Sequence, residues 1–163
     1  MNKPTIGKIY LDLDGVVADF SKRYKELYHM EPREAEKHKK FDVQFKEFIA
    51  NQEFATLDLM PDAMVLVNFL KTLPIPTEIL SSTGRQDSYE SISEQKRIWL
   101  DTHGITFKQN FVPGKRFKYK FATPDSIIID DTLSVIEDWR NAGGIAIWHH
   151  TIPETLSILK MYI

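Results

Sequence analysis

The sequence contains no cysteine, and this absence excludes several classes of chemistry. Disulfide bonds, thiol nucleophiles and cysteine-ligated zinc sites are all removed from consideration. A chain without cysteine is typical of a reducing compartment, so we expect a cytoplasmic protein. Residues 1–5 lead directly into a strand and lack the apolar segment of a secretory signal, which agrees with that expectation.

Long apolar runs are also missing, as is an excess of charge of one sign. No run approaches the roughly 20 residues that a membrane span requires, so we expect no membrane partner. The 21 Lys and Arg residues nearly balance the 23 Asp and Glu residues, giving a net charge of −2. Bulk charge therefore gives no argument for stable nucleic-acid binding. The 163 residues, 42% of them hydrophobic, are enough for one domain with a substantial core. The oligomeric state stays open.

The most informative stretch is Lys8–Phe20. Its apolar run predicts a buried strand, which stops at Asp12 and Asp14 and is followed by Gly15. Residues two apart in a strand point to the same side, and open α/β sheets bind ligands at the carboxyl ends of their strands. Two such carboxylates repel each other unless one is protonated or a cation lies between them, and Mg²⁺ is the natural hard cation. The alternative is an ordinary polar turn, because Asp and Gly are common turn residues.

The second half of the chain alternates between strands and helices. Apolar runs predict strands over residues 77–80, 107–112, 126–129 and 145–148, with helices over 61–70, 88–103, 132–139 and 153–162. This order indicates an α/β fold with a mainly parallel sheet.

The segment between the first two strands, about sixty residues, is far longer than a usual crossover. We interpret residues 19–60 as a small helical cap over the carboxyl edge of the sheet, inserted into a core formed by residues 1–18 and 61–163. The mixed charge run Arg33–Lys40 inside this segment is either a solvated helix face or a nucleic-acid patch, and its interleaved acids weaken the second interpretation.

Other strand ends carry polar residues as well. Ser81 and Ser82 close the second strand, and Lys120 precedes a later strand that ends in Asp130 and Asp131. If the strands are parallel, these residues share one crevice with the first acidic pair. Carboxylates suit Mg²⁺, while hydroxyl and ammonium donors suit phosphoryl oxygens. The sequence lacks the glycine-rich loops of nucleoside triphosphate and dinucleotide sites.

Taken in order, these segments resemble the four motifs of the haloacid dehalogenase-like (HAD) superfamily of phosphoryl-transfer enzymes. The motifs are Asp12–Val17, Ser81, Lys120 and Ile127–Asp131, and the resemblance spans residues 8–131. Each motif is short, and the ordered set is what carries the resemblance. It implies a three-layer, Rossmann-like core with a parallel sheet and a small helical cap after the first strand.

Within this superfamily, the sequence is most similar to the 5′(3′)-deoxyribonucleotidases. The similar segments are Asp14–Phe20, Phe54–Ala63 and Gln95–Leu100. In that family, aromatic residues at the positions of Phe20 and Phe54 pack on the nucleobase, which implies substrate binding here. The alternative is that both phenylalanines simply form core between the cap and the sheet.

The resemblance also implies roles for the acidic residues. Asp12 matches the nucleophile that forms an aspartyl-phosphate, and Asp14 matches the general acid that protonates the leaving alcohol and later activates water. Mg²⁺ would be held by Asp12, by the backbone carbonyl of Asp14 and by Asp131, with Asp130 nearby.

The same resemblance assigns the phosphate-binding groups. Ser81 and Ser82 would hydrogen-bond phosphoryl oxygens, and Lys120 would neutralise charge on the phosphoryl group and the nucleophile. Lys115 and Lys118 belong to the same basic cluster, so any of the three could face inward. The spacing to the acidic pair at the strand end favours Lys120.

Two features stay open. The segment Ser81–Arg85 departs from the Thr-Ser-Pro of the deoxyribonucleotidases and resembles the 3′-phosphatase domain of polynucleotide kinase/phosphatases. Arg85 either contacts a substrate phosphate or nucleic-acid backbone, or pairs with Asp87 or Glu90 on the surface. His149-His150 follows a strand and is either a metal pair or part of a rim, and the opposite directions of adjacent strand residues favour the rim.

These expectations combine into one hypothesis: a Mg²⁺-dependent phosphomonoesterase whose partner is a small phosphorylated substrate, a deoxyribonucleoside monophosphate. One alternative is a phosphatase for the 3′-phosphate of a polynucleotide end or for a small phosphorylated metabolite. Another is a binding module that kept the fold and lost catalysis; the intact acidic and basic residues argue against it.

Overall fold

The computed structural model describes residues 3–163. Its single five-stranded sheet is formed by β1 (Lys8–Leu11), β2 (Thr77–Ser82), β3 (Lys108–Val112), β4 (Ser126–Asp130) and β5 (Ile145–Trp148). The strand order is β3-β2-β1-β4-β5, and every neighbouring pair is parallel. The predicted α/β fold with a parallel sheet is therefore confirmed, and β1 lies at its centre.

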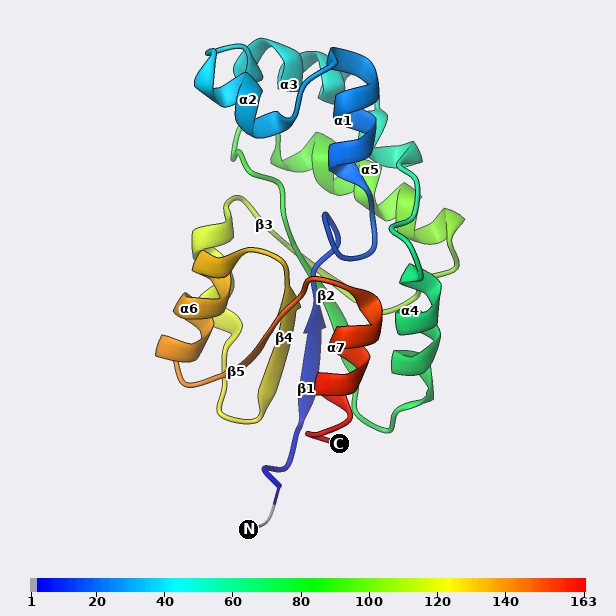
Figure 1. Cartoon of the computed structure of the whole chain (residues 1–163), viewed down its shortest axis with the longest axis vertical. Helices are drawn as coiled ribbons and strands as arrows, with labels where there is room; N and C mark the ends of the chain where they lie inside the picture. The colour runs from blue at the N-terminus through cyan, green and yellow to red at the C-terminus, as the bar shows by residue number, and fades with distance from the viewer. Residues whose placement is uncertain (1–2) are drawn as a thin grey trace.

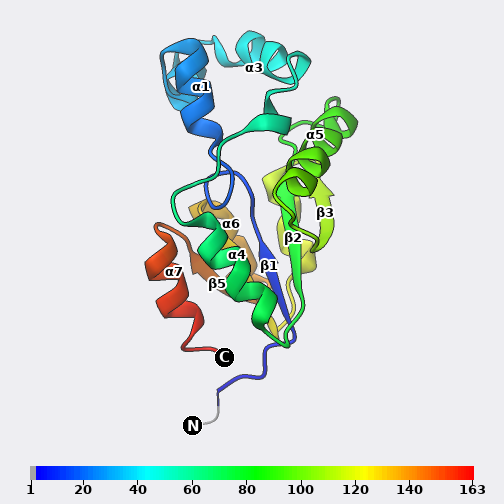
Figure 2. The ribbon, with the colours of Figure 1, turned by 90° about the vertical axis from the view of Figure 1, so that its right-hand side faces the viewer.

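Helices cover both faces of this sheet. They are α4 (Ala63–Thr72), α5 (Tyr89–Thr102), α6 (Leu133–Asn141), α7 (Ile152–Leu159) and the 3-10 helix η2 (Lys115–Phe121). Figures 1 and 2 show α4 and α7 on one face and α6 on the other, which gives the three layers of a Rossmann-like core. Among the helices of residues 3–163, none has both the length and the apolar character needed to span a membrane.

The alternation of side chains along the strands produces the two packed faces. Ile9 and Ile127 join the larger apolar core, which contains the buried residues of α4 and α7. Their neighbours Tyr10 and Ile128 face the opposite way and pack with Trp139 of α6. Adjacent strand residues point to opposite faces, so a strand covered on both sides is apolar throughout. This explains why the sequence showed β1 and β4 as continuous apolar runs.

A helical cap stands between β1 and β2, as predicted. It contains α1 (Phe20–Tyr28), α2 (Pro32–Lys37), α3 (Phe41–Ala50) and the 3-10 helix η1 (Glu53–Thr56). Figure 1 shows α1, α2 and α3 above the carboxyl ends of the strands. The side chain of Asp19 caps α1 by accepting a hydrogen bond from the amide of Lys22 at 3.2 Å. The division of the chain at residues 19 and 60 stays a prediction.

Two backbone contacts join the chain segments that connect the cap to the core. Ala18 pairs with Leu59 in an isolated antiparallel bridge. Beside it, the amide of Met60 donates a hydrogen bond to the carbonyl of Val17 at 2.8 Å. The two chain segments that enter and leave the cap are therefore held side by side.

Helix α5 supplies a second anchor for the cap. Gln95 is fully buried; its side-chain amide donates to the carbonyl of Ile49 at 3.0 Å and accepts from the amide of Phe54 at 3.1 Å. The indole of Trp99 donates to the carbonyl of Leu57 at 2.7 Å. These side chains satisfy backbone groups of the cap that would otherwise be buried without partners, so the cap is seated on α5.

Candidate active site

The ends of three neighbouring strands bring the predicted polar residues together beneath the cap. Asp12 follows β1, Ser81 lies near the end of β2, and Asp130 ends β4. Asp12 is 5% exposed, and Asp130 and Ser81 are fully buried. Carboxylate oxygens of Asp12, Asp130 and Asp131 all lie within 4.8 Å of one another. The structure thus places these four residues in the common crevice that the parallel sheet predicted.

The buried lysine of this cluster is Lys118, and the predicted Lys120 is not part of it. The Nζ of Lys118 donates to Asp12 Oδ1 at 3.0 Å and to Asp130 Oδ2 at 2.7 Å, and its side chain is 1% exposed. Lys120 is exposed, with its ammonium 5.1 Å from the ring centre of Phe117. The inward lysine is therefore Lys118, and the prediction of Lys120 is wrong.

The local structure of η2 is the reason for this correction. A 3-10 helix has three residues per turn, so residues three apart lie on the same side. Lys115 and Lys118 share the side that faces the strand ends, where Lys115 donates to the hydroxyl of Thr132 at 3.1 Å. Lys120 lies two residues beyond Lys118, off that side of the helix, and is exposed. Spacing along the sequence does not reveal this short helix.

Burial and charge crowding determine the ionisation of the cluster. Burial raises the pKa of Asp12 to about 6; Lys118 opposes this shift, and Asp131 and Asp14 add to it. Burial also raises the pKa of Asp130. Burial alone would lower the pKa of Lys118, but Asp12 and Asp130 raise it above its usual value, so the lysine stays an ammonium. The crowded carboxylates would gain from a further positive charge.

The donor set fits a hard divalent cation such as Mg²⁺. Asp130 is already committed, because one of its oxygens accepts from Lys118 and the other from the amide of Thr132 at 2.9 Å. Of the three clustered carboxylates, those of Asp12 and Asp131 therefore remain available to hold a cation. Oxygen ligands of this kind are the ones that Mg²⁺ prefers.

Gly15 makes room for the Asp131 carboxylate. The glycine has a φ of +84°, and a Cβ built on it would lie 2.0 Å from Asp131 Oδ2. The absent side chain therefore lets Asp131 approach the backbone of the loop that follows β1. This is the backbone that carries the carbonyl of Asp14, the third predicted ligand.

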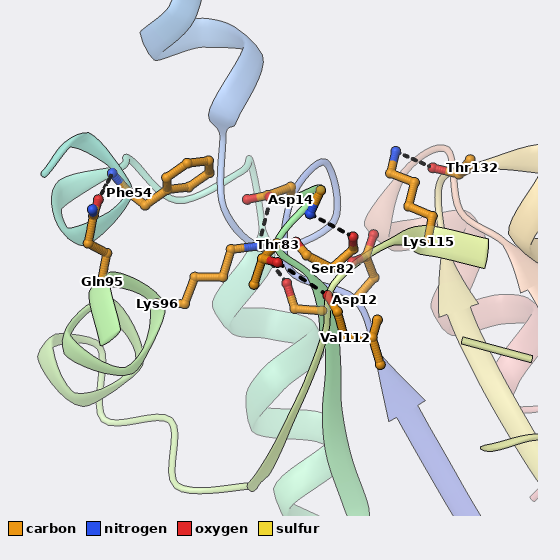
Figure 3. Close-up of polar contacts among 12 residues, drawn as sticks. Asp12, Asp14, Phe54, Ser82, Thr83, Gln95, Lys96, Val112, Lys115 and Thr132 are labelled. Carbon is orange, nitrogen blue, oxygen red and sulfur yellow. Dashed lines mark hydrogen bonds and ion pairs between the residues drawn. The ribbon is translucent and has the colours of Figure 1, made fainter. Parts of the chain in front are cut away.

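A second buried lysine, which the sequence analysis did not assign, reaches the site from α5. Lys96 is 3% exposed, and its Nζ donates to Asp14 Oδ2 at 2.9 Å, to Ser81 Oγ at 2.6 Å and to the carbonyl of Ser82 at 2.9 Å. Figure 3 shows its side chain extending from the helix toward Asp14 and Ser82. The same ammonium lies 5.4 Å from the ring centre of Phe54.

The sequence did carry a signal for Lys96. Ile92, Lys96 and Trp99 are spaced by four and three residues, so they share one face of α5. Ile92 and Trp99 are buried, at 0% and 1% exposure. A lysine on a buried helix face requires an anionic or polar partner, and this requirement could have identified it.

The loop after β2 holds the remaining predicted residues. The hydroxyl of Ser82 accepts a hydrogen bond from the amide of Gly84 at 3.0 Å. Arg85 forms an ion pair with Asp42 of α3, and its guanidinium lies 5.5 Å from the ring centre of Phe45. The partners of Arg85 are therefore cap residues, and not the two nearby acids considered from the sequence. This pair bridges the core and the cap.

A cleft of about 830 Å³ lies between the core and the cap. Asp14, Ser82 and Asp131 line its core side. Its cap side includes four aromatic residues, Phe20, Phe41, Phe45 and Phe54, together with polar and charged residues in and beside α1 and α2 such as Glu31, Arg33 and Glu36. The rings of Phe20 and Phe54 stack with centroids 5.4 Å apart and planes 6° apart. Both phenylalanines thus belong to the packing of the cap and also form a wall of the cleft.

His149 and His150 do not form a metal pair. His149 is 3% exposed, and its Nδ1 lies 2.6 Å from the hydroxyl of Thr155. His150 is exposed, and its Nδ1 lies 3.2 Å from Glu154. The two rings have different partners, so the metal interpretation is wrong.

No protein-family model and no curated protein matches the sequence, whereas solved structures share its fold. A hydrolase from Streptococcus pneumoniae TIGR4 is 17% identical with a TM-score of 0.58, covering 96% of this chain and 99% of that one. A HAD-superfamily hydrolase from Ehrlichia chaffeensis is 12% identical with a TM-score of 0.58, covering 99% and 98%. The L-2-haloacid dehalogenase of Xanthobacter autotrophicus, with chloropropionic acid covalently bound, is 14% identical with a TM-score of 0.57, covering 98% and 85%.

These similarities show that the chain has the fold of the HAD-superfamily hydrolases. None of the three structures points to deoxyribonucleotidases in particular. A shared fold does not determine function, which depends on the residues of the site.

Proposed function

We propose that this HAD-fold chain is a Mg²⁺-dependent phosphomonoesterase that acts through an aspartyl-phosphate on Asp12. The observation that carries the proposal is the convergence of Asp12, Asp14, Ser81 and Lys118 at one edge of the sheet, next to a cleft between core and cap. A nucleophile, an acid, a hydroxyl donor and a fixed ammonium are the groups that hydrolysis of a phosphate monoester requires.

In the first step, a carboxylate oxygen of Asp12 attacks phosphorus. The bond from phosphorus to the ester oxygen breaks, and its electron pair leaves with that oxygen, which takes a proton from Asp14. In the second step, Asp14 accepts a proton from water as the water oxygen attacks the same phosphorus. Phosphate leaves, and the Asp12 carboxylate is restored. Lys118 holds Asp12 through one oxygen, which leaves the other for the attack.

The serine hydroxyls are arranged to donate to phosphoryl oxygens. Ser81 Oγ accepts a hydrogen bond from Lys96, and Ser82 Oγ accepts one from the amide of Gly84. A hydroxyl has one proton to donate besides the lone pairs that accept, so each serine keeps its donor for the substrate.

Mg²⁺ would be held by the side chains of Asp12 and Asp131 and by the backbone carbonyl of Asp14. When bound, it would supply positive charge that offsets the negative charge of the nucleophile and of the phosphoryl group. The fit of the three-carboxylate cluster, with oxygens within 4.8 Å of one another, supports this assignment. Without the ion, a phosphate dianion would face a site whose acids outnumber its two buried ammonium groups, Lys96 and Lys118.

We propose a deoxyribonucleoside monophosphate as the substrate class. The aromatic wall that includes Phe20 and Phe54 suits a planar base, and the cleft volume of about 830 Å³ suits a ligand of nucleotide size. The pair between Arg85 and Asp42 connects the core to the cap beside this cleft, which favours a small substrate over a polynucleotide end. Arg85 lines the cleft and is our candidate for a contact with the bound nucleotide.

A phosphate-ester panel tests both parts of the proposal. Deoxyribonucleoside monophosphates, a 3′-phosphorylated oligonucleotide and small phosphorylated metabolites are assayed with Mg²⁺ and again with a chelator. Strand binding is salt-sensitive, so the oligonucleotide is assayed at two salt concentrations. We expect Mg²⁺-dependent hydrolysis that is fastest for the mononucleotides. A preference for the oligonucleotide or a metabolite would overturn the substrate class, and no hydrolysis of any ester would overturn the reaction.

A further inference from the structure

We propose that Lys96 is the positioning residue for the general acid Asp14. The inference rests on the proposed function and deepens it by assigning a role to a residue outside the four motifs. In this role, the ammonium holds one oxygen of the Asp14 carboxyl group, and the other oxygen carries the proton that goes to the leaving group.

The hydrogen bonds of Lys96 favour this role over direct substrate binding. An ammonium group has three protons to donate. Those of Lys96 have three acceptors at hydrogen-bond distance: Asp14 Oδ2 at 2.9 Å, Ser81 Oγ at 2.6 Å and the Ser82 carbonyl at 2.9 Å. No donor is left for a phosphoryl oxygen while these bonds persist. Lys96 therefore acts on the reaction through Asp14 and Ser81.

Asp14 needs such support more than Asp12 or Asp130 does. Its side chain is 31% exposed and lines the cleft, whereas the side chains of Asp12 and Asp130 are buried and held by Lys118. The acceptors of the two lysines do not overlap. Lys118 holds Asp12, which attacks phosphorus. Lys96 holds Asp14, which protonates the ester oxygen on the other side of the breaking bond.

The place of Lys96 on α5, next to Gln95, also links Asp14 to the cap. The preceding residue, Gln95, bonds the backbone of Ile49 and Phe54 in the cap, and the ring of Phe54 lies 5.4 Å from the Lys96 ammonium. Figure 3 shows Gln95 and Lys96 leaving the same turn of α5, one toward the cap and one toward Asp14. The position of the acid is thus set by the helix on which the cap is seated.

The leaving group of the substrate gives the test. Benzyl phosphate releases a poor leaving group that needs a proton, whereas p-nitrophenyl phosphate releases a phenolate that does not. The ratio kcat/KM covers the steps up to loss of the leaving group, before the water step that both esters share. If Lys96 acts through Asp14, its removal slows benzyl phosphate much more than p-nitrophenyl phosphate.

We expect Lys96→Met to lower kcat/KM for benzyl phosphate by about 100-fold, the scale of general acid catalysis. The loss on p-nitrophenyl phosphate should be at least about tenfold smaller, because the aryl ester does not need the acid. Asp14→Asn should give the same pattern, and the double variant should discriminate between the two esters no more than Asp14→Asn alone does. Lys96→Arg should recover part of the loss, and Arg97→Met, on the exposed side of the same helix, should match the wild type.

Equal losses of Lys96→Met on the two esters would overturn the proposal, because they would indicate a structural or phosphate-binding role. Unchanged rates on both esters would overturn it as well. If Lys96→Met does not fold, as judged by circular dichroism, the Lys96→Gln and Lys96→Arg variants are compared on the same two esters. An inactive wild-type protein would instead contradict the proposed function, so the two failures are distinguishable.

Discussion

At the scale of single residues, the site depends on the pairing of buried charges. Lys118 satisfies Asp12 and Asp130, and Lys96 satisfies Asp14. A buried charge without a partner is costly, so neither lysine is replaceable by an apolar residue without consequence. Together with Asp131, these acids outnumber the two buried ammonium groups, which leaves a net negative site that a divalent cation would balance.

The contrast between Lys118 and Lys120 gives the first prediction. Lys118→Met should lower kcat/KM for the best substrate by about 10²–10³-fold, because it removes the charge that stabilises the nucleophile and the phosphoryl group. It should also lower the free energy of unfolding by about 3–5 kcal/mol at pH 7, because two buried carboxylates lose their partner. Lys120→Met removes an exposed ammonium from the same helix and serves as the control. Urea unfolding and steady-state kinetics of both variants measure these effects, and equal behaviour would contradict the assignment of Lys118.

At the scale of elements, the loop after β1 and the 3-10 helix η2 position residues of the site that the strands alone do not. The parallel strands deliver acids to one edge of the sheet, but the loop and η2 decide which atoms meet there. Gly15 in the loop admits Asp131, and the three-residue turn of η2 directs Lys118 inward.

Gly15→Ala tests the role of the loop. A Cβ at Gly15 would lie 2.0 Å from Asp131 Oδ2, so the variant must displace this carboxylate. We expect Mg²⁺ affinity, measured by calorimetric titration, to fall at least about tenfold, the effect typical of a disturbed metal site. Gly143→Ala is the matched control: its φ of +94° is similarly strained, but a Cβ there meets nothing within 4 Å. If both variants bind Mg²⁺ equally well, Gly15 serves only the turn.

The pattern of the sequence was sufficient to predict most of these elements. Continuous apolar runs predicted β1 and β4, because strands covered on both faces must be apolar throughout. The long segment before the second strand predicted the cap. The acids at the strand ends then predicted the crevice, since parallel strands present their carboxyl ends at one edge.

Some features of the site depend on the tertiary structure and cannot be predicted from local sequence patterns. Spacing along the sequence favours Lys120, whereas the side that a residue of η2 faces depends on a short 3-10 helix. Lys96 lies on a helix far from the strand ends in sequence, and only packing brings it to Asp14. The pairing of Arg85 with Asp42 depends on how the cap sits over the core.

At the scale of the whole molecule, a cleft lies between the cap and the core, with Asp14 and Asp131 on its core side and four phenylalanines among the residues of its cap side. The cap contacts the core where its two connecting segments pair, and it also contacts α5, which places the phenylalanines above the acids. Ionisation of the cluster formed by Asp12, Asp130 and Asp131, and cation binding to it, should change the free energy of unfolding of the protein.

The linkage predicts a pH effect with a definite sign. In the folded protein without Mg²⁺, the pKa of Asp12 is about 6, above its ordinary value of 3.8. Its contribution to stability is then fully present below pH 3.8 and is lost as the pH rises through about 6. With a chelator present, the difference in unfolding free energy between the wild type and Asp12→Asn should shift in favour of the variant over this interval. A difference that does not change with pH would contradict the buried, crowded environment of Asp12.

Added Mg²⁺ should reverse this trend. Metal ligands must be deprotonated, so protons and Mg²⁺ compete for Asp12. We expect the rise in melting temperature caused by Mg²⁺ to be larger at pH 7 than at pH 5 in the wild type, and to be strongly reduced in Asp12→Asn. An equal rise at both pH values would indicate that the ion binds elsewhere.

The central claim is that phosphoryl transfer passes through Asp12. The most direct measurement is acid quenching of the enzyme during turnover of its best substrate with Mg²⁺, followed by mass spectrometry of its peptides. The account predicts a transient phosphoryl group on Asp12 that is absent from Asp12→Asn. Sustained turnover by Asp12→Asn, or a phosphoryl group on another residue, would contradict it.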